Sequence, residues 1–171
     1  MKPYLIIALQ LLVFSAPGSA QENTDTQPVK EVARLTQQAV PYNLEHIRQT
    51  FTKTVHGGVQ HVVVKSADDQ ADIKLIQAHL RKLAEQFQKG DFSVTEHIHG
   101  ENTPGLRQLK MANPNDIKFA YKALENGAQI HYTSEYPQYV TALHEWFEAQ
   151  AREHGNDLLP DHSQHHASQA E

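Results

Sequence analysis

A strand–turn–strand–helix pattern occurs twice in this chain and constrains the fold more than any other feature. The first copy has β-rich runs at 44–55 and 59–64 around the Gly57-Gly58 pair, and a helical segment follows at 70–89. Paired glycines supply the positive φ angles that a two-residue hairpin turn needs. The first copy therefore predicts an antiparallel hairpin followed by a helix.

The second copy lies in the C-terminal half. Alternating apolar residues predict a strand at 117–124, and Asn126-Gly127 is the strongest dipeptide signal for a hairpin turn. A return strand follows at 128–134. Pro137 then suits the first turn of a helix that runs to about residue 153.

The two turns can be aligned with Gly58 opposite Gly127 and Gln60 opposite Gln129. A duplicated ββα unit implies an α+β fold, in which a four-stranded, mainly antiparallel sheet carries two helices on one face. Apolar residues at helical spacing over 29–40 predict a short additional helix at the N-terminal end.

The helix predicted at 70–89 has a continuous apolar stripe, which it can bury against the sheet. The stripe consists of Ile73, Ile76, Leu80, Leu83, Ala84 and Phe87. Residues 91–111, between the two copies, are rich in turn formers and predict an irregular loop with a short helical turn near 106–109. Loops of this length in compact domains are commonly functional.

The first twenty residues have the organisation of a secretory signal peptide. A basic start at Lys2 precedes an apolar run at 4–14, and small residues lead to a predicted cleavage site after Ala20. The apolar run is too short to span a bilayer well, although an uncleaved anchor is the alternative. We expect export to the periplasm and no stable membrane insertion after cleavage.

These features divide the chain into four parts. A signal peptide covers 1–20, a polar leader with the short helix covers 21–43, and a single ββα-ββα domain covers 44–156. A polar tail at 157–171 is expected to be disordered. It contains His162, His165 and His166, which either capture metal loosely or have no role.

Composition excludes several kinds of site. The chain has no cysteine and a net charge of −5 with histidine neutral, so it has no disulfide, thiolate metal site or thiol nucleophile, and a nucleic-acid partner is disfavoured. Met111 would be the only methionine left after cleavage, which excludes a Met-rich Cu(I) site. None of the motifs HExxH, GxSxG, GxGxxG or the Walker loop is present.

Histidine is the residue type in clear excess, with twelve in the chain. His79 and His144 lie on opposite flanks of the apolar stripes of their helices, so two parallel neighbouring helices would bring them face to face. His56 lies at the first hairpin turn, and the central loop with His99 could close over the pair. Imidazole nitrogen suits Cu(II), Zn(II), Ni(II) or haem iron. The carboxylates considered as further ligands or orienting groups are Asp91, Glu96, Glu101 and Glu145.

From residue 51 to residue 155 the chain resembles a family of small exported bacterial proteins of unestablished function, often labelled "aspartate carbamoyltransferase" in genomes. The matching stretches are FTKTVHGGVQ at 51–60, AHL at 78–80, GDFS at 90–93, IHG at 98–100, PGL at 104–106, ALHEWFEAQ at 142–150 and HG at 154–155. The residues do not support the label, because a transcarbamylase is a longer cytosolic enzyme with paired α/β domains and a Ser-Thr-Arg-Thr phosphate loop.

The family pattern places histidines where this chain has His56, His79, His99, His144 and His154. The resemblance therefore implies that these five act as a set. The pattern usually has a methionine before Pro-Gly-Leu, and this chain has Thr103 there. A methionine ligand in relatives would be absent here.

The leading hypothesis is a periplasmic histidine-rich binding protein that sequesters or delivers a transition metal, with Cu, Zn or Ni as the metal and haem as a further option. Its ligands would be His56, His79, His99 and His144, with His154 as an additional candidate. One alternative is a small metal-dependent or histidine-based enzyme. Another is a protein–protein interaction module without a ligand, which would use an open sheet face and could form a homodimer.

Overall fold

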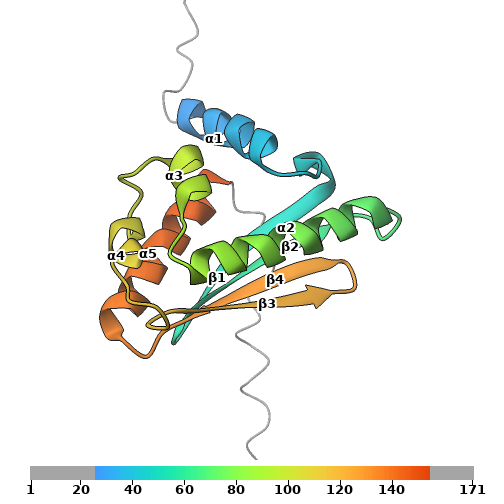
Figure 1. The fold of residues 1–171 in the computed structure, drawn as a ribbon. Helices are drawn as coiled ribbons and strands as arrows, with labels where there is room; N and C mark the ends of the chain where they lie inside the picture. Colours follow the sequence, from blue (N-terminus) through green and yellow to red (C-terminus); the bar gives the residue numbers. More distant parts are fainter. Residues whose placement is uncertain (1–25, 155–171) are drawn as a thin grey trace, which may run out of the picture.

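The computed structural model describes residues 26–154, which form five α-helices, one 3₁₀ helix and four strands (Figure 1). The expected signal peptide and histidine-containing tail lie outside these residues. In chain order the elements are α1 (Thr26–Ala39), η1 (Leu44–His46), β1 (Ile47–Thr54), β2 (Gly57–Val64), α2 (Gln70–Gln88), α3 (Ser93–His99), α4 (Leu106–Lys110), β3 (Lys118–Leu124), β4 (Gly127–Thr133) and α5 (Pro137–Glu153).

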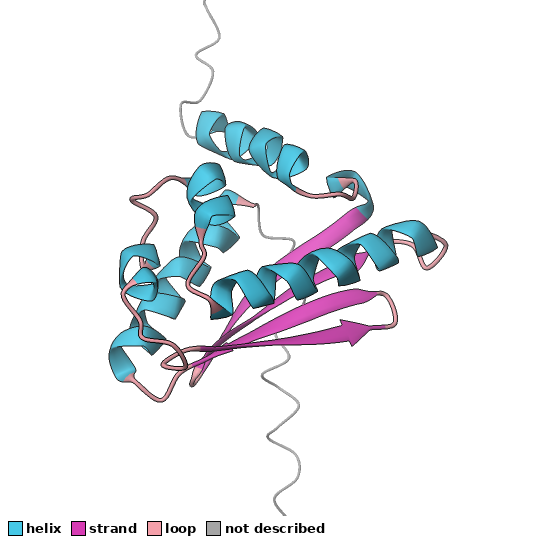
Figure 2. Ribbon diagram, viewed as in Figure 1, coloured by secondary structure: helices cyan, strands magenta, loops and turns pink. Residues whose placement is uncertain are grey.

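The strands form one antiparallel sheet in the order β1-β2-β4-β3, so the two hairpins meet through their second strands. Helices α2 and α5 cover one face of this sheet (Figure 2). The predicted α+β class, the four-stranded antiparallel sheet and the short N-terminal helix are confirmed. Among the described residues, no helix combines the length and the apolar character that a membrane span needs.

Each long helix packs mainly on the hairpin of the other unit. Helix α2 follows β2 in the chain but lies mostly on β3 and β4, and α5 follows β4 but lies on β1 and β2. The two units therefore interlock, and neither hairpin is covered by its own helix alone.

The predicted hairpin turns at Gly57-Gly58 and Asn126-Gly127 are wrong: the two-residue loops are Val55-His56 and Glu125-Asn126, and the return strands β2 and β4 begin at Gly57 and Gly127. The alignment of the two hairpins is also displaced by one residue. Gly57 pairs with Thr54 across a two-residue loop, and Gly127 pairs with Leu124 in the same way. Both glycines have positive φ, at 146° and 156°, and a Cβ on either would collide with a backbone carbonyl oxygen of the neighbouring central strand. Gly57, not Gly58, is thus the counterpart of Gly127.

A shift of one residue turns a side chain to the opposite face of a strand. In the observed register the counterpart of Gln60 is Ile130, and the two are paired across β2 and β4. Gln60 therefore points toward the helices, where its side chain accepts a hydrogen bond from the Tyr132 hydroxyl at 2.6 Å.

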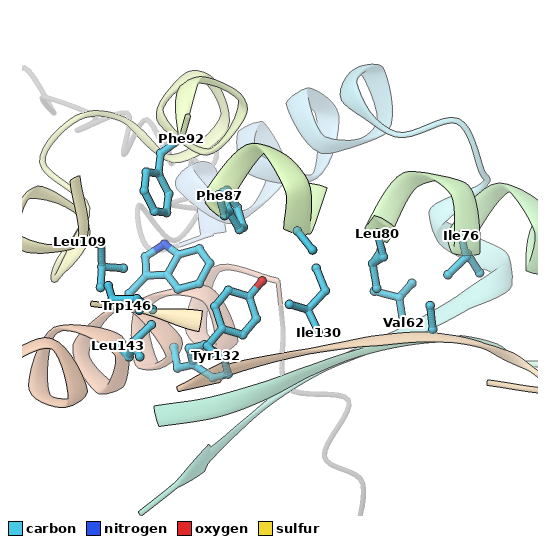
Figure 3. Close-up of a cluster of buried hydrophobic side chains, with 14 of the residues drawn as sticks. Val62, Ile76, Leu80, Phe87, Phe92, Leu109, Ile130, Tyr132, Leu143 and Trp146 are labelled. Carbon is cyan, nitrogen blue, oxygen red and sulfur yellow. The ribbon is translucent and has the colours of Figure 1, made fainter. Parts of the chain in front are cut away.

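The core lies between the sheet and the helices (Figure 3). Leu80 of α2 packs over Val62 of β2, with Ile76 on one side of this pair and Ile130 on the other, and all four are fully buried. An aromatic cluster continues the core toward α5 and contains Phe87, Phe92, Tyr132, Trp146 and Phe147.

The central segment is more regular than expected. The predicted helical turn near 106–109 is confirmed as α4, but α3 was not predicted. Helix α3 is fixed at its start, where the Asp91 carboxylate accepts the backbone N–H of Ser93 at 3.0 Å. Phe92 stacks on Phe87, with ring centres 4.8 Å apart. These tertiary contacts stabilise a helix whose apolar pattern is too short to be recognised in the sequence.

Candidate functional site

A small pocket lies where α1, α2, α3 and α5 meet above β1 and β2. It is lined by His79 of α2, His99 at the end of α3 and His154 immediately after α5, and we call it the histidine pocket. Its volume is about 60 Å³, which is space for a few water molecules. Helix α1 and the segment after it contribute Thr36 and Tyr42 to the wall.

Helical spacing brings three polar side chains of the C-terminal segment to the same wall. Trp146, Gln150 and His154 follow one another at intervals of four residues and all line the pocket. Residues four apart lie on one face of a helix. The backbone N–H of His154 still donates to the Gln150 carbonyl, so His154 continues the row beyond the last residue of α5.

His99 is held by a carboxylate. Its Nδ1 lies 2.5 Å from Oε2 of Glu153, and only 3% of the His99 side chain is exposed. Burial lowers the pKa of His99 to about 4, so the ring is neutral at pH 7. Since a carboxylate only accepts hydrogen bonds, Nδ1 carries the proton and Nε2 keeps a free lone pair.

His154 packs between an aromatic ring and His99. It stacks on Phe51 with ring centres 5.8 Å apart, and its ring meets that of His99 edge-on at 5.1 Å. Burial, with a smaller contribution from His99, lowers the pKa of His154 to about 3. This second imidazole is therefore also neutral near pH 7.

His79 forms the α2 side of the pocket. Its ring meets the edge of Tyr42 at 5.7 Å between centres. Burial and, to a lesser extent, the charge of Lys82 lower its pKa. All three histidines of the pocket thus favour the neutral form, which is the form that binds a metal or accepts a proton.

The structure separates the five predicted histidines into two groups. His144 lies outside the pocket and donates from Nε2 to the Thr54 carbonyl at 2.8 Å, and His56 is exposed in the neighbouring turn. The expected contact between His79 and His144 does not form, because α2 and α5 pack on different hairpins instead of side by side.

The orienting carboxylate is one that sequence reasoning missed. Of the four expected carboxylates, Asp91 accepts the backbone N–H of Ser93, Glu96 pairs with Lys110, and Glu101 and Glu145 are exposed. Glu153 takes the role instead, from the last turn of α5. Only its position next to His154 in the sequence could have suggested that Glu153 orients a histidine. Its contact with His99 of α3 depends on the tertiary fold.

Two buried donors of the pocket wall were also missed. Trp146 Nε1 and Gln150 Nε2 have no hydrogen-bond acceptor among the described residues, although the two residues are only 2% and 3% exposed. A glutamine in an apolar row was the available signal for a polar cavity.

In the observed arrangement of residues 26–154, no group of three or more His, Asp or Glu side chains could hold a metal ion. One pair comes near the required geometry. Two imidazoles that bind one tetrahedral ion through metal–nitrogen bonds of about 2 Å have ring centres about 5 Å apart. The His99 and His154 rings, 5.1 Å apart, have this separation.

No protein-family model, curated protein or solved structure matches the chain. The residues of the pocket and their contacts are therefore the basis for a proposed function.

Proposed function

We propose that this protein binds one divalent transition-metal ion, Cu(II), Zn(II) or Ni(II), in the histidine pocket through His79, His99 and His154. One observation carries the proposal: three imidazoles that favour the neutral form, from three separate helical segments, line the same small cavity.

The state of the ligands supports the proposal. A histidine must lose its ring proton to bind a metal, and burial keeps these rings neutral well below pH 7. Histidine ligands in metal sites commonly donate their second ring nitrogen to a carboxylate, which fixes the ring and raises its basicity. The contact between His99 Nδ1 and Glu153 has this form.

Binding requires one local rearrangement. His99 and His154 already have a suitable separation, whereas His79 would turn its ring from the edge of Tyr42 toward them. An edge contact between aromatic rings is worth about 0.5–1.5 kcal/mol, which is small against the free energy of binding a transition metal.

The cavity volume of about 60 Å³ fits an ion and supports a metal over the haem alternative.

Sequestration or delivery in the periplasm is the role that this site and the predicted signal peptide suit together. Residues of α1 and α3 contribute to the lining of the pocket that would hold the ion. The sheet face without helices (Figure 2) remains the surface proposed for the alternative hypotheses of an interaction module or a homodimer.

The proposal is tested by calorimetric titration of Zn(II), Cu(II) and Ni(II). The background variant has His162, His165 and His166 changed to Ala, so that the tail does not bind metal. We expect one site per chain and a more than tenfold weaker affinity in His99→Gln and in His154→Gln. His56→Gln and His144→Gln are matched controls outside the pocket and should bind like the background. Equal affinities in all four variants would refute the pocket as the site.

A second candidate function follows from the same His99–Glu153 contact. A neutral histidine held by a carboxylate, with Nε2 free, can act as a general base on a small substrate. Coordination number separates the two functions: three protein ligands and a water favour metal-dependent catalysis, whereas four protein ligands favour storage. X-ray absorption of the metal-loaded protein measures this number.

A further inference from the structure

Two buried hydrogen-bond donors of the histidine pocket have no use in the metal site proposed above. Trp146 Nε1 and Gln150 Nε2 have no acceptor among residues 26–154, yet both residues are more than nine-tenths buried. A buried donor without an acceptor costs about 1–3 kcal/mol, and folded proteins contain few of them. Two in one wall of one cavity indicate a partner that the chain itself does not provide.

The two donors are placed together by the helix. Trp146 and Gln150 are four residues apart on the inner face of α5, in the row that continues to His154. Figure 3 shows the indole nitrogen of Trp146 on the side of its ring away from Leu143 and facing Phe92. Trp146 and Gln150 are both part of the pocket lining.

Two neighbouring polar groups already have partners. The Gln60 side-chain oxygen accepts from the Tyr132 hydroxyl at 2.6 Å, and the Thr36 hydroxyl donates to the Val32 carbonyl at 2.7 Å. In the proposed site the free ring nitrogens of the three histidines bind the metal ion, so the partner that Trp146 and Gln150 lack brings its own acceptor atoms.

We infer that the histidine pocket binds a small planar oxyanion, such as formate or bicarbonate, together with the metal ion. Its oxygens accept hydrogen bonds from Trp146 Nε1 and Gln150 Nε2, and it occupies the coordination position that three histidines leave open. The cavity of about 60 Å³ limits the anion to this size. The inference rests on the proposed metal site, because the Glu153 carboxylate brings a negative charge to the same region and the metal ion supplies the positive charge that an anion needs there.

The single tryptophan of the chain provides a direct probe. In ¹⁵N-labelled protein the indole N–H of Trp146 gives one cross-peak, and formate can be titrated at pH 7 into the zinc-loaded and the metal-free protein. We expect a saturable downfield shift of this peak in the zinc-loaded protein alone. Gln150→Leu should weaken formate binding at least tenfold. Gln138→Leu, on the exposed face of the same helix, should bind formate like the unmodified protein.

The outcomes separate the two proposals. If zinc binds but formate does not move the indole peak, the anion site is refuted and the metal site stands. If zinc does not bind and formate still moves the peak, the metal site is refuted, and so is an anion that is held together with the metal. If neither ligand has an effect, both proposals are refuted.

Discussion

The two halves of the sheet are built alike but lined differently. Where α2 covers β3 and β4, the inward residues are apolar, and Ile130 is fully buried in the same core as Ile76 and Leu80. Where α5 covers β1 and β2, the position equivalent to Ile130 is Gln60, and the wall of α5 contains Gln150 and the adjoining His154. The same scaffold thus holds an apolar core in one half and a polar pocket in the other.

The difference shows how, in a duplicated fold, one half can supply most of the stability while the other half holds a binding site. Buried apolar side chains contribute most of the stability of a small domain, and the α2 half supplies a continuous set of them. The α5 half includes buried polar groups that lower stability when they lack partners. We therefore expect changes in the α2 half to alter stability, and changes in the histidine pocket to alter ligand binding.

The largest effect is expected from Ile76→Ala in the apolar half. Ile76 is fully buried, and replacing a buried isoleucine by alanine costs about 2–5 kcal/mol of unfolding free energy through lost burial and a residual cavity. Denaturant unfolding measures the loss. The metal affinity of the folded variant should stay unchanged, because Ile76 does not line the pocket. A parallel loss of affinity would contradict the division between the halves.

Acid should destabilise the protein through the pocket histidines. The pKa values of His99 and His154 are about 4 and about 3 in the folded state, against about 6.5 in an unfolded chain. The unfolded state therefore takes up protons first as the pH falls, and stability decreases from about pH 6.5 down to about pH 4. The slope approaches about 1.4 kcal/mol per pH unit for each histidine.

Unfolding free energies measured between pH 7 and pH 4 test this expectation. His154→Gln should remove about half of the slope, and His56→Gln should remove none. A stability that does not change over this range would show that the two rings are not buried as neutral groups.

The two turn glycines should respond almost equally to substitution. Gly57→Ala and Gly127→Ala each place a Cβ against a backbone carbonyl oxygen at a positive φ, and such strain costs about 1–3 kcal/mol. Thermal unfolding compares the two variants directly. A large loss in one and none in the other would mean that the two hairpins are not equivalent.

The last prediction concerns metal binding and the change Glu153→Gln. An amide oxygen accepts the His99 Nδ1–H less strongly than a carboxylate, and loss of such an orienting group commonly weakens metal binding about 10–100-fold. Glu145→Gln, an exposed residue of the same helix, is the control and should leave metal binding unchanged. Equal affinity in both variants would show that the carboxylate does not support a metal ligand.

Local patterns were sufficient to predict the elements that depend on local sequence. The apolar stripe of α2 and Pro137 at the start of α5 predicted both long helices within a residue or so of their observed bounds. The hairpin register was predicted wrongly, because Gly57 and Gly58 were placed in the turn, whereas both belong to strand β2. Only the close approach of the central strands selects Gly57.

The site depended more on tertiary structure. His79 and His144 have similar positions beside their stripes, and the sequence does not reveal that α2 and α5 pack on different hairpins. The place of His154 in the pocket wall could have been predicted from its spacing, because it lies four residues after Gln150 and eight after Trp146. The contact between Glu153 and His99 joins residues 54 positions apart and depends on the placement of α3.

Anomalous diffraction from crystals of the zinc-loaded protein tests the central claim most directly. We expect one strong peak in the histidine pocket, about 2.0–2.1 Å from a ring nitrogen of each of His79, His99 and His154. A pocket without a peak, or zinc only at exposed histidines such as His56, would contradict the account.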